Sequence, residues 1–512
     1  MIQGTRSERI AVLLSFMAVF AAYQVHDRVF ERMAHIEDEM AYLWQSQIIA
    51  RGYLTLPSPP EPKSFLYPFV VDYHGQRFSK YPLPWPVVLS LGVHLGASYL
   101  VNPILAGLGL WLVYCLGKRL FGETVSLLAS VLMLTSPFFL INSGSLLAHP
   151  LGLVLSAAFA LAWIDGFSEP NHPHPWLATL VAGSAIGLLA LCRPLTAVAV
   201  AFPFSLHGLY LLICGDWSIR RRLLLLVIIA LLLVSLHFIW QCAVTGDPLL
   251  NPYTLWWEYD KVGFGPGFGR VTGGHSLDQA WINTKFSLYV GQFDLFGWGS
   301  YSWIFLPFGL IAILRDRNWR ALLPVFVFPC LVVVYLAYWI GSSLFGPRYF
   351  YEALYSLTLL SAMGIAFLAG WPTLPGKSFP NFTRRHRIRP LAITVLVVLL
   401  VATNLLFYSP IRLGGMYGLY GVQRSHLLPF TIPEAQEYTP ALVIVHTSGK
   451  WIEYGTLLEL EDPFLSTPFI FVLSRGSKID NDIASYFPDR KVYHYYPAEE
   501  PYLFYTAPRP AP

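Results

Sequence analysis

Long apolar runs recur along this chain from residue 10 to residue 408, and they constrain its fold more than any other feature. A helix needs about 20 apolar residues to cross the hydrocarbon core of a membrane. Hydrophobic residues make up 55% of the 512-residue chain and charged residues only 12%, so these runs do not fit the buried core of a soluble protein. They predict an all-α polytopic membrane protein. The candidate spans are residues 10–25, 103–117, 124–141, 146–166, 176–192, 194–214, 222–243, 300–314, 320–340, 353–370 and 390–408.

The basic residues of the short connections predict which side of the membrane each loop faces. They gather at Arg6 to Arg9, Lys118-Arg119, Arg220 to Arg222, Arg315 to Arg320 and Lys377 to Arg389. All of these places lie in the cytoplasm, as positively charged loops do, if the further apolar stretch 84–101 does not cross. Pro84 and Pro86 suit the start of a helix, so we expect this stretch to lie in the outer interface. The resulting topology has about eleven spans, a cytoplasmic N-terminus and an outer C-terminus.

This topology divides the chain into a membrane domain and an outer tail. Residues 1–408 form the membrane domain, whose long outer loops are 26–102 and 244–299. Residues 409–512 differ in character and predict a small outer α/β domain. The expected strands of this domain are 441–447, 468–474 and 491–496, and its expected helix is 478–487. Because the inner face keeps only short basic connections, we expect any chemistry on the outer face.

Three consecutive carboxylates, Glu37, Asp38 and Glu39, follow the first span. The residues after them, up to Gly52, have the apolar spacing of a short helix on the membrane surface. Acidic side chains in the first turn of a helix stabilise it through the helix dipole. On the residues alone, this structural explanation and a functional one both stay open.

Three cationic side chains, Lys80, Arg193 and Arg348, are predicted near the outer membrane boundary. Lys80 precedes an interfacial helix, where a lysine also serves as an anchor to lipid headgroups. Arg193 interrupts an apolar stretch, so it either faces a wet cavity or reaches out to the interface. Arg348 is followed by Tyr349 and two further aromatic residues, a combination that suits a phosphate with an apolar tail.

Other polar residues of the outer segments are candidates for a substrate loop. Loop 244–299 is longer than a connection between two spans needs. The candidates are His149, Tyr259, Asp260, His275 and Asp294. A lone histidine such as His149 is more often a hydrogen-bonded structural residue than a ligand. The Gly-rich part of the loop follows no expected strand, so it is not a nucleotide-binding fingerprint.

These features, in this order, resemble the GT-C glycosyltransferases, in the family 39-like branch that holds protein O-mannosyltransferases and the lipid A aminoarabinose transferase. That branch carries Asp-Glu-x-x-Tyr after the first span, as Asp38-Glu39-Met40-Ala41-Tyr42 does here. Its Lys-Pro-Pro-Leu-aromatic motif is similar to Lys80-Tyr81-Pro82-Leu83-Pro84-Trp85, which has a tyrosine inserted. A late Arg-Tyr pair matches Arg348-Tyr349, and the likeness covers about residues 1–370.

The resemblance implies an inverting enzyme that moves a sugar from a polyprenyl-phosphate carrier to an acceptor hydroxyl. It implies Asp38 as the general base, with Glu39 orienting the acceptor. The side chains implied around the donor phosphate are Lys80, Arg193, Arg348 and Tyr349. The implied acceptor is a glycan, a lipid or a protein, and we expect no cofactor, no obligatory metal and no nucleic acid. The implied location is the plasma membrane, which is the inner membrane of a bacterium, with the active face outside.

Two other classes of protein remain as alternatives. A transporter or flippase of a lipid-linked sugar would carry charged residues deep inside its spans, and these spans hold almost none. A non-enzymatic membrane scaffold would not need charges to gather on one face near the interface. Within the enzymes, transfer of a whole oligosaccharide to asparagine would ask for a larger outer domain than the tail of about one hundred residues.

Overall fold

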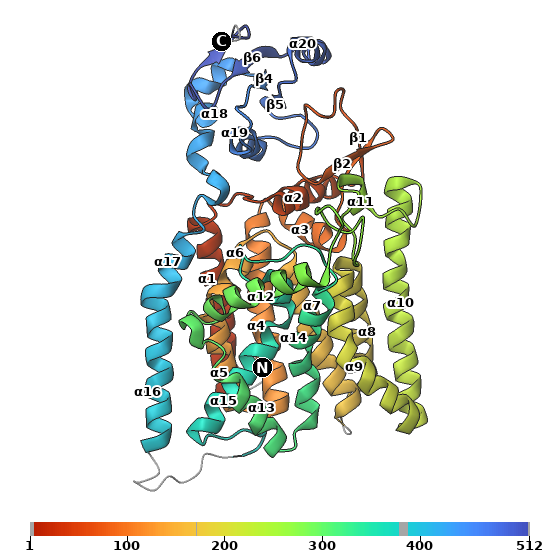
Figure 1. The fold of residues 1–512 in the computed structure, drawn as a ribbon, viewed down its shortest axis with the longest axis vertical. Coiled ribbons are helices and arrows are strands. Elements are labelled where there is room, and N and C mark those ends of the chain that lie inside the picture. The colour runs from red at the N-terminus through yellow and green to blue at the C-terminus, as the bar shows by residue number, and fades with distance from the viewer. Residues whose placement is uncertain (1–4, 170–171, 378–387, 510–512) are drawn as a thin grey trace.

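The computed structural model describes residues 5–169, 172–377 and 388–509 as an upright bundle of helices with a small sheet beyond one end (Figure 1). Eight helices of these residues are long and apolar enough to cross a membrane, or up to ten if each of two bent pairs forms one span. The chain is therefore a multi-pass membrane protein. The bundle consists of α1 (Arg6–Arg28), α4 (Val101–Phe121), α5 (Glu123–Leu134), α6 (Pro137–Gly144), α7 (His149–Trp163), α8 (Pro175–Cys192), α9 (Pro194–Cys214), α10 (Trp217–Thr245), α13 (Leu306–Arg315), α14 (Leu322–Tyr335), α15 (Leu354–Ala369) and α16 (Ile388–Thr403).

Every predicted span coincides with helical structure, but not every one is a full-length helix. α13 and α14 have only 10 and 14 residues, so the number of eleven spans stays a prediction. The span expected over 124–141 is broken between α5 and α6, which meet at an angle of 61°. Pro137 begins α6 and lacks the N–H that would continue α5. The Ser136 hydroxyl caps the new helix by accepting a hydrogen bond from Phe139 N at 3.2 Å.

The first long loop lies at the end of the bundle that carries residues 409–509, here called the tail end (Figure 1). The helix α2 (Glu37–Ala50) confirms the expected helix that starts with the three carboxylates. α3 (Pro84–His94) has 11 residues, too few to cross a hydrocarbon core by itself. Between these helices, β1 (Leu56–Pro57), β2 (Val70–Tyr73) and β3 (Gln76–Ser79) form an antiparallel sheet that we did not predict.

The second long loop contains a helix that the sequence did not predict. α12 (Leu277–Asp294) has 18 residues and makes an angle of 100° with the helical segment Gly299–Arg315 that follows it. In Figure 1 it lies across the upright helices. Trp281 is exposed on this helix, while Gln279 and Asn283 interrupt the apolar pattern. Because a helix lying on a surface needs only one apolar face, no long apolar run marks it.

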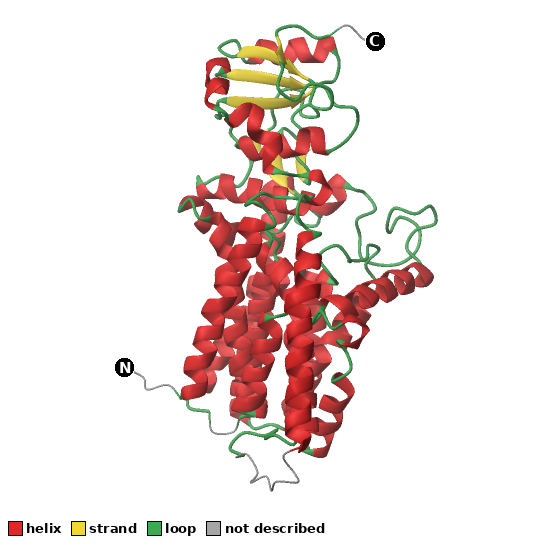
Figure 2. Cartoon of the chain, turned by 90° about the vertical axis from the view of Figure 1, so that its left-hand side faces the viewer, coloured by secondary structure: helices red, strands yellow, loops and turns green. Residues whose placement is uncertain are grey.

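Residues 409–509 contain a four-stranded sheet with the strand order β5-β4-β6-β7, which Figure 2 shows beyond the tail end of the bundle. The strands β4 (Ala441–Val445), β5 (Phe469–Leu473) and β6 (Lys491–Tyr495) are parallel, and β7 (Phe504–Tyr505) pairs antiparallel with β6. With α20 (Ser477–Tyr486), they agree with the expected strands and helix within two residues. The buried apolar runs of this region are therefore readable as strands from sequence.

The sheet of the tail packs against the first long loop. Phe65 of that loop lies in one apolar cluster with Leu442 and Ile470 of the sheet. The backbone N–H of Leu473 donates to the carbonyl of Ser64 at 2.8 Å, which satisfies part of the exposed edge of β5. Two segments far apart in sequence therefore form one structure above the bundle.

Asp294 links the second long loop to the start of the tail. Its side chain is 1% exposed. It accepts hydrogen bonds from Tyr408 Oη at 2.7 Å and from Arg412 Nε and Nη2 at 2.9 and 3.0 Å. We considered Asp294 as a substrate-loop residue, but these contacts engage both of its carboxylate oxygens. The structure supports an anchoring role for this residue.

We expect Asp294→Ala to destabilise the protein, because it leaves the half-buried Arg412 without its anion. Removing one partner of a buried ion pair costs about 3–5 kcal/mol. The thermal unfolding midpoint of the purified protein in detergent measures the effect. Arg28→Ala is the control, because Arg28 is 79% exposed in its pair with Asp27 and should leave the midpoint unchanged. Equal midpoints for Asp294→Ala and the wild type would contradict the anchoring role.

Candidate active site

Asp38 lies in the first turn of α2 and is held from two directions. Its Oδ1 accepts a hydrogen bond from the Tyr81 hydroxyl at 2.6 Å. Its Oδ2 is 3.5 Å from Arg348 Nη2. The side chain of Asp38 is 23% exposed, so the carboxylate remains accessible. Tyr81 is the tyrosine inserted in the Lys-Pro-type motif, and its contact with Asp38 was not predicted.

The surroundings of Asp38 favour its charged form. Burial is the largest single influence on the pKa of this carboxyl and raises it, but the Arg348 guanidinium, the Tyr81 hydroxyl and two further cations together lower it by more, so the net pKa is below its usual range. The cations of Lys80 and Arg193 act in the same direction. Asp38 is therefore ionised at neutral pH and able to accept a proton.

Glu39 differs from its neighbour, because its carboxylate is occupied by the backbone. Its Oε2 accepts from the N–H groups of His35 at 2.9 Å and Ile36 at 3.2 Å, and its Oε1 accepts from Leu146 N at 2.7 Å. The residue is 1% exposed. These contacts cap α2 and fix it to the connection between α6 and α7. In this arrangement Glu39 orients the helix that carries Asp38.

Lys80 is enclosed at the junction of the two long loops. Its Nζ lies 3.1 Å from Asp260 Oδ2, and the side chains of both residues are at most 3% exposed. The ammonium also faces four aromatic rings, with the Phe69 ring centroid at 3.7 Å. Burial lowers the pKa of Lys80 below its usual value, although Asp260 opposes this. Asp260 further accepts from Tyr338 Oη at 3.1 Å and Trp339 Nε1 at 3.0 Å.

Arg193, at the turn between α8 and α9, is paired with a carboxylate that the sequence analysis did not single out. Its Nε lies 2.9 Å from Oε1 of Glu352, a residue with no exposed surface. Nδ1 of His149 lies 3.0 Å from the same oxygen. Arg193 Nη2 donates to the Tyr335 hydroxyl at 3.1 Å. The sequence could have indicated Glu352 by its position, because it is a carboxyl at the start of an apolar run, four residues after Arg348.

Arg348 and Tyr349 connect this pair to Asp38. The guanidinium of Arg348 lies over the Tyr349 ring, 5.6 Å from its centroid, and its side chain is 17% exposed. The Tyr349 ring in turn stacks on Tyr335 with a centroid distance of 4.9 Å. Arg193 and Arg348 therefore approach the same stack of aromatic rings from two sides.

The structure places the remaining candidates of the second long loop in supporting contacts. Tyr259 stacks on Trp257, one of the rings around Lys80, with a centroid distance of 6.0 Å. His275 Nε2 is 2.9 Å from the carbonyl of Leu336, and its ring stacks on Phe264 at 5.1 Å. His275 therefore fastens the Gly-rich segment to the end of α14, away from the contacts of Asp38.

The site as a whole contains three ion pairs, which we call the charged cluster. Its members are Asp38–Arg348, Lys80–Asp260 and Arg193–Glu352. The longest of the three contacts, at 3.5 Å, is that of Asp38. Asp38 is also the most exposed of the three carboxylates, at 23% against 2% and 0%. The pair Asp38–Arg348 is therefore the one most open to a substrate.

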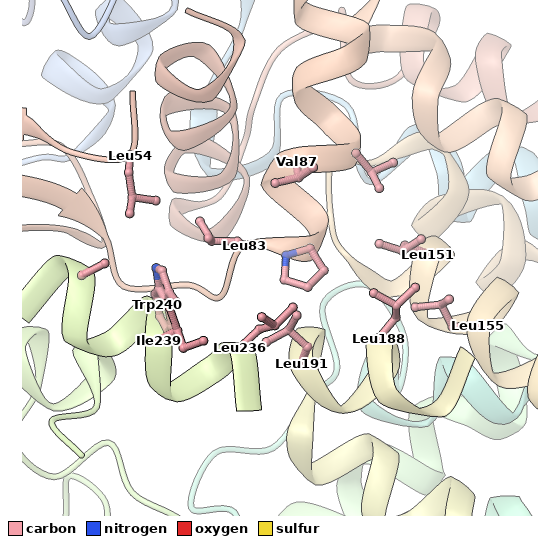
Figure 3. Close-up of a pocket in the computed structure, with 13 residues that line it drawn as sticks. Leu54, Leu83, Val87, Leu151, Leu155, Leu188, Leu191, Leu236, Ile239 and Trp240 are labelled. Atoms are coloured by element: carbon pink, nitrogen blue, oxygen red, sulfur yellow. The ribbon is translucent and has the colours of Figure 1, made fainter. Parts of the chain in front are cut away.

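An apolar cavity of about 470 Å³ is lined by segments that also carry residues of the site (Figure 3). Leu83, Leu151 and Leu191 line it, and each lies two residues from Tyr81, His149 or Arg193 in the sequence. The segments that carry the polar groups therefore also supply the walls of the cavity. Further lining side chains come from α3, α7, α8 and α10. Such a space in segments that also carry ion pairs suits a ligand with a charged head and an apolar tail.

Comparisons with known proteins agree with this architecture. Residues 86–240 match the family model of the dolichyl-phosphate-mannose-protein mannosyltransferases. The structure of ArnT from Cupriavidus metallidurans bound to undecaprenyl phosphate is 15% identical, with 94% of this chain and 89% of that chain covered and a TM-score of 0.59. The archaeal oligosaccharyltransferase AglB from Archaeoglobus fulgidus, in complex with an inhibitory peptide and a dolichol-phosphate, is 12% identical over 94% and 69% of the two chains, with a TM-score of 0.51.

No curated protein sequence matches the chain. At identities this low the structural matches show the fold, and the fold is that of the GT-C glycosyltransferases. The expected resemblance to the GT-C glycosyltransferases is thereby confirmed for the fold.

Proposed function

We propose that this chain, a membrane protein with the GT-C fold, transfers a sugar from a polyprenyl-phosphate carrier to an acceptor hydroxyl. The observation that carries the proposal is the accessible, ionised carboxylate of Asp38, held 3.5 Å from Arg348. An apolar cavity whose walls come from neighbouring segments adds to it. A base, a fixed cation and a space for a lipid tail are the parts that this reaction needs.

In the proposed reaction Asp38 removes the proton from the acceptor hydroxyl. The hydroxyl oxygen forms a bond to the anomeric carbon of the sugar as the bond from that carbon to the phosphate oxygen breaks. The phosphate leaves with the bonding electron pair, and Asp38 holds the proton. The hydrogen bond from Tyr81 at 2.6 Å fixes the carboxylate during this step. A single displacement of this kind inverts the anomeric configuration.

The proposed task of the cations is to stabilise the negative charge that develops on the departing phosphate. Arg348 and Arg193 are suited to it, because a guanidinium offers paired N–H donors to phosphate oxygens. Their side chains are 17% and 14% exposed. Lys80 is 3% exposed and paired with Asp260. We propose that Lys80 stabilises the phosphate mainly through long-range electrostatic attraction and not by direct contact, because its ammonium is already enclosed.

The apolar cavity supports a lipid-linked donor over a water-soluble nucleotide sugar. Its lining is almost entirely leucine, valine and other apolar side chains. Because an isoprenoid chain reaches this space from the lipid bilayer and not from water, its gain there is van der Waals contact with the apolar lining. We propose that the phosphate at the head of such a chain lies toward Tyr81 and Arg193, which are two residues from the lining residues Leu83 and Leu191 in the sequence.

We propose that the charged cluster faces the outside of the plasma membrane and that about eleven spans place the N-terminus inside. Basic connections meet at the opposite end of the bundle, where Arg119 pairs with Asp165 at 2.7 Å and Arg320 with Glu169 at 2.6 Å. Arg384, Arg385 and Arg387 lie outside the described residues. In this proposal residues 1–408 form the membrane domain and residues 409–512 a small α/β domain outside.

The proposal is tested by transfer from radiolabelled polyprenyl-phosphate sugars to membrane glycans, lipids and proteins, with purified protein in liposomes. We expect label to move from at least one polyprenyl-phosphate sugar, with release of polyprenyl phosphate. A transporter would instead carry the intact lipid-linked sugar across the bilayer. Movement of label without cleavage of the sugar–phosphate bond would contradict the proposal.

Tyr81→Phe should shift the pH dependence of transfer. The variant loses the hydroxyl that lowers the pKa of Asp38, so burial raises this pKa with less opposition. Asp38 acts as a base only when ionised, and the acidic limb of the pH–rate profile of kcat should therefore move to higher pH. Tyr486→Phe serves as the control, because Tyr486 is exposed on α20 of the tail. An acidic limb that stays in place, or moves to lower pH, would contradict the contact.

A further inference from the structure

Glu352 is the most enclosed member of the charged cluster. It lies near the end of the short helical segment Arg348–Ala353, which leads into α15, and none of its surface is exposed. One oxygen, Oε1, faces both Arg193 Nε at 2.9 Å and His149 Nδ1 at 3.0 Å. The other oxygen, Oε2, has no hydrogen-bond partner within the described residues. A buried carboxylate with one unsatisfied oxygen is costly and calls for a reason other than packing.

The backbone around Glu352 leaves space for its carboxylate. A Cβ atom on Gly152 of α7 would lie 2.7 Å from Glu352 Oε1 and 2.8 Å from its Cγ. Glycine at this position therefore admits a side chain that alanine would displace. His149, one turn earlier on the same helix, points its Nδ1 at the same oxygen. α7 thus contributes both the contact and the space.

The contacts of Arg193 show which part of its guanidinium is free. Nε is used by Glu352 and Nη2 by the Tyr335 hydroxyl. No partner is recorded for Nη1 within the described chain, and the Arg193 side chain keeps 14% of its surface exposed. One edge of the guanidinium is therefore occupied by resident groups, and the Nη1 end is left for a ligand.

We propose that Glu352 is a positioning residue that fixes Arg193 and acts as its resident counter-anion, so that the phosphate product is released. This inference rests on the proposed function. The donor is a phosphodiester with one negative charge, whereas the product is a phosphate monoester that carries about −1.5 to −2 at neutral pH. An arginine without a counter-anion would bind the product more tightly than the donor. The resident charge of Glu352 opposes the product more than the donor, because repulsion grows with ligand charge.

The test compares Glu352→Gln with the wild type for binding and inhibition by polyprenyl phosphate. The glutamine keeps the size of the side chain and removes its charge. We expect polyprenyl phosphate to bind and inhibit about tenfold more tightly, because a like-charge repulsion close to the ligand is lost. Steady-state kcat should fall, while the rate of a single turnover should fall much less, since release becomes slower. Glu37→Gln, an exposed carboxylate on α2, is the control for loss of one charge nearby.

A second variant separates charge from folding. Glu352→Asp keeps the charge but shortens the reach to Arg193, so product inhibition should stay at the wild-type level while the KM for the donor rises. Glu352 is not a counter-anion if polyprenyl phosphate inhibits Glu352→Gln no more strongly than the wild type. The same conclusion follows if polyprenyl phosphate inhibits Glu352→Asp and Glu352→Gln equally. Binding of polyprenyl phosphate is measured by the thermal stabilisation of the protein, and this assay needs no turnover. A wild type that binds this lipid but transfers no sugar therefore contradicts the proposed function and leaves the effect of Glu352 measurable.

Discussion

Asp38→Asn lowers kcat by about 10²–10⁴-fold in the proposed mechanism, the usual contribution of a general base. The asparagine oxygen still accepts the hydrogen bond from Tyr81, so the side chain keeps its place. Its loss of charge removes the group that takes the proton of the acceptor hydroxyl. It also frees Arg348 from its partner at 3.5 Å. The KM for the donor should therefore be unchanged or lower, and the loss should appear in kcat.

The neighbouring carboxylates provide matched controls for this expectation. Glu37→Gln removes an exposed charge from the same helical turn and should leave the transfer rate near the wild-type level. Glu39→Gln leaves one fewer acceptor for the N–H groups of His35 and Leu146. Its main effect should be a lower unfolding temperature. If Glu39→Gln alone abolishes transfer in folded protein, the base is Glu39, and full activity of Asp38→Asn would remove the catalytic role of Asp38.

Arg348→Ala has the second-largest expected effect, a loss of about 10²–10³ in kcat, as found when a fixed donor to a developing negative charge is removed. Arg348→Lys should recover only part of the rate, because an ammonium lacks the planar pair of N–H donors. The transfer rate at saturating donor measures both variants. Arg28→Ala, at a position 79% exposed, is the control for loss of one positive charge.

Arg348→Ala should also change the pH dependence of transfer. Burial raises the pKa of Asp38, and Arg348 is the strongest of the groups that lower it. Without Arg348 the pKa of Asp38 rises, and the acidic limb of the pH–rate profile moves to higher pH. A mutation that only loosened the fold would reduce the rate at every pH without moving the limb. An unmoved limb would show that Arg348 does not act on Asp38.

The elements that the sequence predicted are those with a local signature. Apolar runs marked the bundle, three carboxylates marked the start of α2, and buried β-branched runs marked β4 and β5. α12 and the small sheet of the first loop were not predicted, because short or half-exposed elements leave no long apolar run in the sequence. The break between α5 and α6 has a local cause in Pro137. A proline inside an apolar run does not by itself predict whether the helix bends or ends there.

The residues of the site likewise divide into those that the sequence indicated and those that only the structure showed. Lys80, Arg193 and Arg348 were singled out because a charge beside an apolar span is conspicuous, and Asp38 was singled out by its place in the motif of the resembling family. Their partners were not, because pairing depends on the approach of distant segments. Arg193 and Glu352 lie on different helical segments of the bundle, and the contact of Tyr81 with Asp38 joins two parts of the first loop. Asp294 shows the converse: a conspicuous carboxyl that the fold uses as an anchor.

The anomeric configuration of the transferred sugar is the most direct test of the central claim, which is a single displacement by a hydroxyl that Asp38 activates. A donor of defined configuration is incubated with the purified protein, and the configuration of the product glycoside is assigned by NMR. The account predicts the opposite configuration in the product, with formation that depends on Asp38. A product with the donor's configuration would require a double displacement or a same-face substitution, and would contradict Asp38 as the base of a one-step inverting transfer.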